Sequence, residues 1–201
     1  MSGVAFVKAR KGPGRSIIYT TGDGAECKYS GGDPAWRSNN PGNLVPGKIS
    51  KRNGAIGVAG GFAIFPDYET GHRALLDSLK TSHGNKSLQD MIAVFAPPSE
   101  NKTTRYLRFL RGKTGVSDNR KIADFSSAEF EKLWRAIEQM EGRKPGRIKP
   151  VKSAPPKKAK KQISPVRKNK KGTIVSYYVD GIGWISKEAT ALITVINGPC
   201  R

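Results

Sequence analysis

With 201 residues, the chain is long enough for one domain of ordinary size and a shorter appended segment. Its net charge of +20 predicts an anionic partner such as nucleic acid, an anionic membrane surface or a cell-wall polymer. No apolar run approaches the roughly 18 residues of a membrane-spanning helix, so we expect no membrane span. Two cysteines, Cys27 and Cys200, are too few for a disulfide scaffold or a four-ligand zinc site.

The positive charge is concentrated in one segment. Arg143–Lys171 contains 13 Lys or Arg and no Asp or Glu, which leaves 23 basic against 16 acidic residues, or +7, in the rest of the chain. Repeated prolines and dense like charge argue against a continuous helix or a compact core in this segment. We expect residues 143–172 to form a basic, Pro-rich linker, through which nucleic acid could bind by releasing counterions. The linker contains no aromatic residue on which single-stranded bases could stack.

The beginning of the chain predicts short β structure. Residues 1–15 are mostly small and basic and predict a flexible arm. The β-prone residues 16–21 precede an Asp23-Gly24 turn, after which 27–29 can return as the second strand of a hairpin.

The segment Trp36–Leu44 (WRSNNPGNL) combines an aromatic residue, a cation, carboxamides and a Pro-Gly turn. Pro fixes φ, Gly tolerates positive φ and Asn side chains bond nearby backbone, so this segment predicts a rigid polar loop. Such a loop either locks the fold or presents amides to a polar ligand. The Gly-rich stretch 45–63 follows and contains no GxGxxG fingerprint between a strand and a helix. We expect no cofactor and no metal.

Apolar residues at helical spacing predict four helices after a short strand at 62–65. The first begins near Asp67, the second is capped by Ser87, the third covers 103–111, and the fourth begins with a Ser126/Glu129 capping box and ends at Gly142. We therefore predict a mainly α (α+β) fold for a domain over residues 16–142. After the linker, 173–201 predicts a small ββα unit whose helix begins at Ser186.

Three segments, in this order, resemble a known family. Trp36–Leu44 is similar to the RNNNPGN[LI] loop of lysozyme-like domains in phage virion proteins and secreted bacterial toxins. Gly61–Gly71 (GFAIFPDYETG) resembles that family's GFAVFPxxExG segment, and Ala96–Thr103 (APPSENKT) resembles its YAPPSENxT segment. Thr114–Val116 follows where the family has TG[IL]. The resemblance covers residues 30–142 and implies a lysozyme-like helical domain. Members of the family are regarded as peptidoglycan hydrolases or cell-wall-associated phage proteins, which makes peptidoglycan the expected partner.

Cleavage of a glycosidic bond requires a carboxylic acid that protonates the leaving oxygen. Phage relatives often carry a Glu about ten residues before the loop Arg, and Glu26 lies 11 residues before Arg37 in a hairpin-like context. Glu26 is our first candidate for the acid and Glu69, in the first turn of a helix, is the second, while Asp33 is a weaker candidate. The loop contains no proton donor of its own, so the acid must come from a neighbouring element.

The residues expected to bind sugar are Trp36, Arg37, Asn39, Asn40, Asn43, Tyr68 and Glu100. Amides and Arg can hydrogen-bond the N-acetyl groups of sugars, and aromatic rings can stack on sugar faces. Each also has a structural alternative, because Asn and Arg side chains can lock a loop, carboxylates can cap helices and aromatic rings can belong to the core. We expect the three motif segments to converge on one cleft.

The sequence thus predicts a peptidoglycan glycosidase, either a muramidase or a lytic transglycosylase, acting as a phage component or a secreted antibacterial effector. One alternative is a non-catalytic protein that binds cell wall or nucleic acid. Another is a Cys-dependent peptidoglycan amidase in which Cys27 works with His72 or His83. The start of the chain lacks the apolar region of a signal peptide. We therefore expect synthesis in the bacterial cytoplasm and delivery to the envelope by a specialised secretion system or a virion, with an immunity protein as a further candidate partner.

Overall fold

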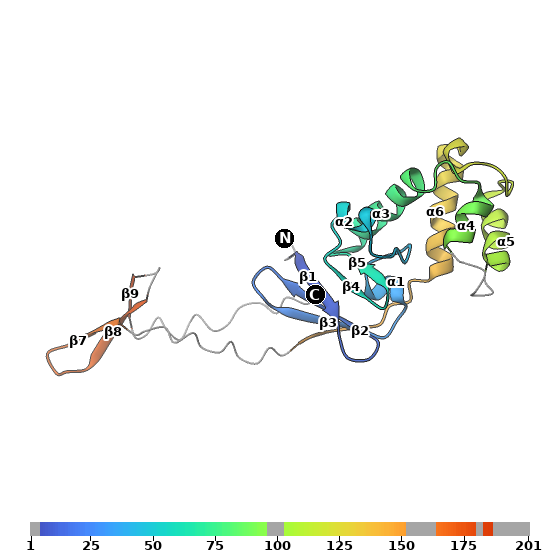
Figure 1. Ribbon diagram of the computed structural model, residues 1–201. Coiled ribbons are helices and arrows are strands. Elements are labelled where there is room, and N and C mark those ends of the chain that lie inside the picture. The colour runs from blue at the N-terminus through green and yellow to red at the C-terminus, as the bar shows by residue number, and fades with distance from the viewer. Residues whose placement is uncertain (1–4, 96–102, 152–163, 180–182, 187–201) are drawn as a thin grey trace. The chain divides into compact units, whose positions relative to one another are not determined.

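The structure, a computed structural model, describes residues 5–95, 103–151, 164–179 and 183–186 (Figure 1). The chain divides into two compact units, Met1–Val151 and Lys152–Arg201. Within the described residues, every helix is too short or too polar to cross a membrane.

A four-stranded antiparallel sheet, with the strand order β1-β2-β3-β6, begins the first unit. Its strands are β1 (Phe6–Lys11), β2 (Ser16–Thr21), β3 (Glu26–Ser30) and β6 (Arg147–Pro150). The predicted hairpin is confirmed, since β2 and β3 pair from Ser16↔Ser30 to Thr20↔Glu26. One face of this sheet is apolar because Ile17 and Tyr19 alternate with residues of the opposite face and pack against Ile64.

Two of these strands lie where the sequence predicted irregular chain. Residues 6–11 of the predicted flexible arm form β1, and residues 147–150 of the predicted linker form β6. Both are edge strands rich in Lys and Arg, which is a usual way to protect a sheet edge. Backbone hydrogen bonds to β2 and β3 hold these two strands in the sheet, so they form without the alternating apolar pattern by which a strand is predicted from sequence.

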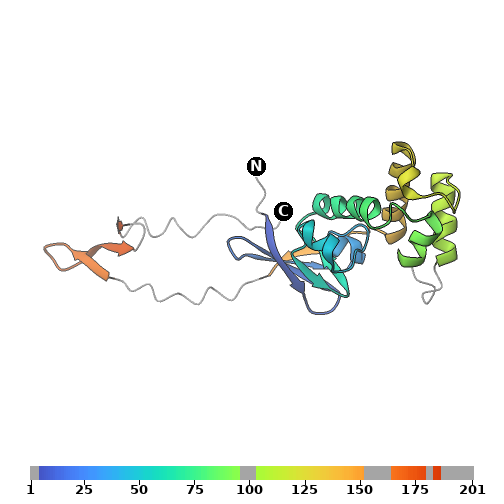
Figure 2. The ribbon, with the colours of Figure 1, turned by 45° about the horizontal axis from the view of Figure 1, so that its top comes forward.

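A two-stranded ribbon and six helices complete the first unit. β4 (Gly57–Ala59) pairs with β5 (Phe62–Ile64), and the sequence predicted only the second of these strands. The helices are α1 (Pro34–Arg37), α2 (Lys48–Arg52), α3 (Tyr68–Thr81), α4 (Leu88–Phe95), α5 (Thr103–Thr114) and α6 (Ser127–Glu141). In Figures 1 and 2, α4, α5 and α6 lie together at the end of this unit away from β1–β3. The main core lies among α3, α4, α5 and α6 and contains Leu75, Met91, Leu110 and Leu133.

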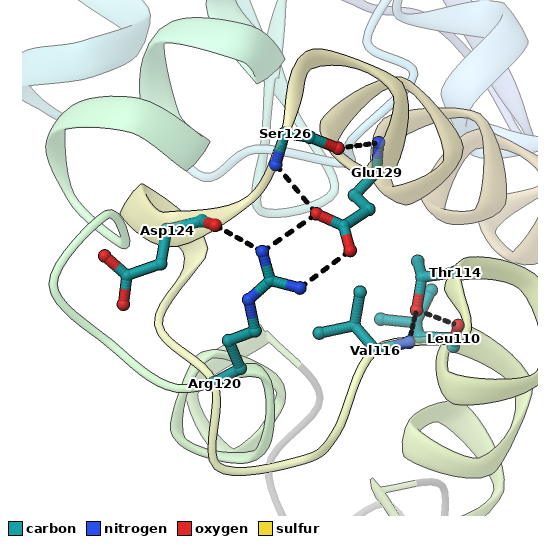
Figure 3. Close-up of polar contacts among 7 residues, drawn as sticks. All are labelled: Leu110, Thr114, Val116, Arg120, Asp124, Ser126 and Glu129. Atoms are coloured by element: carbon teal, nitrogen blue, oxygen red, sulfur yellow. Dashed lines mark hydrogen bonds and ion pairs between the residues drawn. The ribbon is translucent and has the colours of Figure 1, made fainter.

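The predicted helix starts are confirmed by their caps. Asp67 Oδ1 accepts a 2.7 Å hydrogen bond from the Thr70 amide at the start of α3. At the start of α6, Ser126 and Glu129 form the predicted capping box (Figure 3). Arg120 donates two hydrogen bonds to the Glu129 carboxylate, at 2.7 and 2.9 Å, and this contact is the main reason why the pKa of Glu129 falls to about 2.

Helix α5 is longer than predicted, because Gly112 lies inside it and not beyond its end. Thr114 closes the helix: its hydroxyl donates to the Leu110 carbonyl and accepts from the Val116 amide, as Figure 3 shows. The Thr-Gly-Val segment of the resemblance therefore has a structural role as a helix end.

The predicted mainly α fold with a short β element is wrong. The first unit is mixed α+β, because a four-stranded sheet and a two-stranded ribbon accompany its helices. The misjudged part is the sheet, half of which comes from the two basic edge strands described above.

The second unit contains a three-stranded antiparallel sheet of β7 (Ser164–Lys168), β8 (Ile174–Val179) and β9 (Gly183–Ser186). The two predicted strands of the ββα unit are confirmed, and β7 is a third strand inside the predicted linker. Ser186, where the sequence predicted the start of a helix, is the last residue of β9, and the rest of the predicted helix up to residue 197 lies outside the described residues.

Candidate functional site

The Trp36–Leu44 loop is locked mainly by its own polar side chains. Asn40 is fully buried, and its amide donates to the Leu44 and Ala63 carbonyls, each at 2.9 Å. The side-chain oxygen of Asn40 accepts from the Leu44 amide at 2.9 Å. All three hydrogen bonds join the loop to itself or to β5, so Asn40 is a structural residue and does not face a ligand.

Asn39 and Arg37 have the same kind of role. Asn39, at φ 50°, donates to the carbonyls of Phe65 and Pro66. The Arg37 guanidinium donates to the carbonyls of Gly31 and Gly32 at 2.8 and 2.6 Å. Both side chains therefore donate hydrogen bonds to backbone carbonyls of the same unit.

Asn43 is the loop residue that turns toward a carboxylate. Its amide donates a 2.7 Å hydrogen bond to Oε2 of Glu141, the last residue of α6. The Tyr106 hydroxyl of α5 donates to Oε1 of the same carboxylate at 2.9 Å. Three segments far apart in the sequence thus meet at Glu141, a residue that the sequence did not single out.

A cavity of about 750 Å³ opens beside this carboxylate. Its polar lining includes Asn43, His83, Arg105, Tyr106 and Glu141. The apolar part of the lining comes from Leu44, Val45, Phe62, Val94, Phe95 and Met140. Among its described lining residues, Glu141 is the one carboxylate.

Two polar atoms of the lining residues are buried without a hydrogen-bond partner among the described residues: Oδ1 of Asn43 and Nδ1 of His83. The Asn43 assignment is fixed by chemistry, because its other amide atom must donate to Glu141. Buried polar groups are normally paired, and an unpaired one costs roughly 1–3 kcal/mol.

Burial sets the charge state of two groups in this lining. Burial raises the pKa of Tyr106 far above its ordinary value, and the neighbouring Glu141 charge raises it further, so the hydroxyl stays neutral and donates. Burial lowers the pKa of His83 to about 4, with a smaller contribution from Lys86. His83 is therefore a neutral imidazole at pH 7 and can both donate and accept a hydrogen bond.

The stability of the protein should depend on pH through His83. Because its pKa falls from 6.5 to about 4 on folding, the unfolded chain binds more protons between these values. Stability is then highest above pH 6.5 and decreases as the pH falls to about 4, by up to roughly 3 kcal/mol from this group. Urea unfolding at pH 7 and pH 4.5 measures the loss. His83→Gln should show a smaller loss than the wild type, and equal losses would contradict this assignment.

Tyr68 lies in a second polar cluster, centred on Glu138 of α6. The Tyr68 hydroxyl and His72 Nδ1 contact Oε1 of Glu138 at 2.9 and 2.8 Å. Arg143 lies over the Tyr68 ring, 3.6 Å from its centroid, and Trp134 meets His72 edge-on. Burial and the hydrogen bond to Glu138 raise the pKa of Tyr68 to about 12. Arg143 covers one face of this ring, which also stacks with His72 at 5.7 Å between ring centroids, so the ring is already in contact with other residues of the fold.

Among the described residues, the carboxylates of the predicted acids form no hydrogen bond with Trp36–Leu44. Glu26 lies on β3 and forms a 3.0 Å ion pair with Arg10 of β1. Glu69 is exposed in the first turn of α3, and Asp33 accepts a hydrogen bond from the Lys144 amide at 2.7 Å. Glu100 lies outside the described residues.

Trp36 and Cys27 also belong to the fold. The Trp36 ring packs on Tyr29, with 5.2 Å between ring centroids. Cys27 is fully buried in β3 and is not a free thiol, so it lacks the exposed thiolate that an amidase nucleophile needs.

Comparison with known proteins shows a short similarity to a phage protein. The chain matches no family model. It is similar to "Protein P5" of Pseudoalteromonas phage PM2, with 36% identity over 50 residues, which is 25% of this chain and 31% of that protein. The match thus spans about a third of the phage protein's length, and this chain is similar in one segment to a bacteriophage protein.

Proposed function

We propose that the protein is a peptidoglycan glycosidase in which Glu141 is the general acid. The observation that carries this proposal is the cavity of about 750 Å³, in which Tyr106 and Asn43 hold the Glu141 carboxylate. Its volume falls within the range of about 300–1,000 Å³ for small-ligand sites. The polar side chains of the lining, Asn43, His83, Arg105 and Tyr106, suit a ligand rich in hydrogen-bonding groups, such as an amino sugar.

The chemistry requires that Glu141, whose two oxygens accept hydrogen bonds from Asn43 and Tyr106 in this structure, first takes up a proton. Glu141 donates its proton to the glycosidic oxygen while the C1–O bond breaks, and the bonding electron pair leaves with that oxygen. The sugar ring then carries positive charge at C1, which either water or the sugar's own hydroxyl can attack, and the Glu141 carboxylate takes up the proton that the attacking oxygen loses. The usual two-carboxylate mechanisms need a second Asp or Glu near the scissile bond. Attack by the sugar's own hydroxyl, as in a lytic transglycosylase, needs one catalytic acid, and Glu141 can supply it.

Three further points support a cell-wall substrate. The motif segments resemble those of a family of peptidoglycan hydrolases, and two of these segments are joined directly. The Phe65 amide donates to the Ser38 carbonyl, and the Ala63 amide donates to the Leu44 carbonyl, each at 2.9 Å. The net charge of +20 suits an anionic envelope, and the similarity to a phage protein suits delivery in a virion. We propose action in the envelope as a phage component or as a secreted antibacterial effector.

Digestion of purified sacculi by the full-length protein tests this function. We expect soluble muropeptides, and mass spectrometry should find anhydro-sugar ends and few reducing ends. If all products carry reducing ends, the enzyme is a muramidase and not a lytic transglycosylase. Intact sacculi at all values between pH 5 and pH 8 would contradict a glycosidase, and co-sedimentation with those sacculi would then favour the non-catalytic binding protein.

A further inference from the structure

The outer face of the four-stranded sheet carries a regular array of cations. The register aligns Arg10, Lys28 and Lys149 across β1, β3 and β6, with Ile18 of β2 between the first two. Lys8 and Arg147 lie two residues from this row, on β1 and β6, and point to the same side because side chains alternate along a strand. We call this set the basic sheet face: Lys8, Arg10, Lys28, Arg147 and Lys149.

The opposite side of the same sheet is the one that packs against the rest of the unit. Tyr19 and Ile17 belong to its core cluster, with Phe6 and Tyr29 packed against them. On the basic sheet face, four of the five cations are exposed and Lys28 is half-buried. Glu26 is the one acidic residue of these four strands and pairs with Arg10. The face therefore presents strong positive charge to solvent.

One pair on this face is unfavourable for the isolated protein. Lys28 and Lys149 are directly opposite each other in the β3–β6 register, and among the described residues neither forms an ion pair with an acid. Like charges directly opposite on neighbouring strands destabilise a sheet. An anion bound across the two ammonium groups would remove this repulsion.

We propose that the basic sheet face binds the phosphate backbone of double-stranded DNA without reading its sequence. Strands lie about 4.8 Å apart, so β1 and β6 are roughly 14 Å apart and the cations form a firm, extended array. Duplex DNA carries one negative charge per about 1.7 Å of its axis, so roughly eight phosphates occur over that distance. Within these four strands no aromatic residue lies on the basic face, which leaves nothing to stack on bases or to insert into a lipid bilayer. This binding site is separate from the cavity at Glu141 and does not depend on the proposed glycosidase function.

Two triple variants of the full-length protein test this proposal. Lys8, Lys28 and Lys149 are replaced by Ala in the first variant. The matched control replaces Lys48, Lys121 and Lys132, three lysines exposed elsewhere in the same unit, so that both variants lose the same charge. Fluorescence anisotropy with a labelled 20-base-pair duplex measures Kd between 50 and 200 mM salt, and a duplex of scrambled sequence should bind equally.

The sheet variant should lose three phosphate contacts. The slope of log K against log salt should then become less steep by about 2.7. Between 50 and 200 mM salt, the variant should therefore lose roughly 40-fold less affinity than the wild type loses. The control triple should keep nearly the wild-type slope. Equal changes in both variants would overturn the proposal, and so would wild-type binding to anionic vesicles or sacculi without binding to the duplex.

A single substitution separates binding from stability. Lys149→Glu places opposite charges across from each other at the β3–β6 pair, so Tm should rise by about 1–3 °C while duplex affinity falls. A lower Tm together with lower affinity would mean general damage to the sheet and would contradict the proposed cost of the Lys28/Lys149 pair.

Discussion

Glu141→Gln is expected to reduce the rate of sacculus digestion by about 10²–10⁴-fold, the usual contribution of a general acid. A glutamine keeps the size of the side chain and can still accept a hydrogen bond from Tyr106, but it has no acidic proton to give to the leaving oxygen. Its NH2 group would face the NH2 group of Asn43, and the contact is kept if the Asn43 amide turns so that its oxygen accepts from the glutamine. Release of soluble muropeptides at several enzyme concentrations measures the effect, and thermal unfolding shows that the variant is folded.

Three other Glu→Gln variants are matched controls for Glu141→Gln. Glu26 is paired with Arg10 on the sheet and Glu69 is exposed on α3, so their variants should keep at least a tenth of the wild-type rate. Glu138 lies one helical turn before Glu141, and its variant should lose stability through Tyr68 and His72 and lose less activity than Glu141→Gln. Full activity of Glu141→Gln would remove this residue as the acid. If Glu26→Gln is inactive and has a wild-type Tm, the catalytic acid is Glu26 on the sheet and not Glu141.

Local sequence signals were sufficient for the four longer helices and for the Asn-rich part of the loop, but not for the short α1 and α2, which lie in segments predicted as loop. Asp67, Ser126 and Glu129 cap helices as predicted, because capping depends on residues three positions apart. The rigidity of the Trp36–Leu44 loop also follows from its own residues, since Asn40 closes it with three hydrogen bonds. The sequence could not show which of the three Asn side chains lies beside the cavity, because that depends on neighbours from β5 and α6.

The acid and the edge strands depend on contacts across the whole chain. Glu141 is 98 residues from Asn43 in the sequence, and its position at the end of an amphipathic helix looks like that of any solvent-facing Glu. A search for carboxylates near the motif in sequence therefore found Glu26 and Glu69. β6 joins β3 over a similar separation, and its Lys and Arg residues resemble those of the linker that follows. Basic composition alone cannot distinguish a solvated linker from a charged edge strand.

Gly71→Ala is the substitution with the largest expected effect on stability. Helix α3 crosses the Asn-rich loop so closely that a Cβ at Gly71 would lie 1.8 Å from the Asn39 carbonyl oxygen and 3.1 Å from Pro41. Backbone atoms on both sides of this contact are fixed, because Asn39 is tied to the Phe65 and Pro66 carbonyls. The helix must therefore move away from the loop, at a cost of about 3 kcal/mol or more. For a unit of this size, Tm should fall by roughly 6–12 °C.

Gly112→Ala is the matched control, since Gly112 also lies inside a helix but has nothing within 4 Å of the added Cβ. Alanine is the better helix former, so this variant should be as stable as the wild type or more stable, by up to about 1 kcal/mol. Thermal unfolding of both variants measures the difference. Equal Tm values would mean that the loop shifts enough to accommodate the added methyl group of α3. In that case the close contact at Gly71 would not explain why a glycine ends the Gly61–Gly71 motif segment, and the loop that carries Asn43 would be less rigid than its hydrogen bonds indicate.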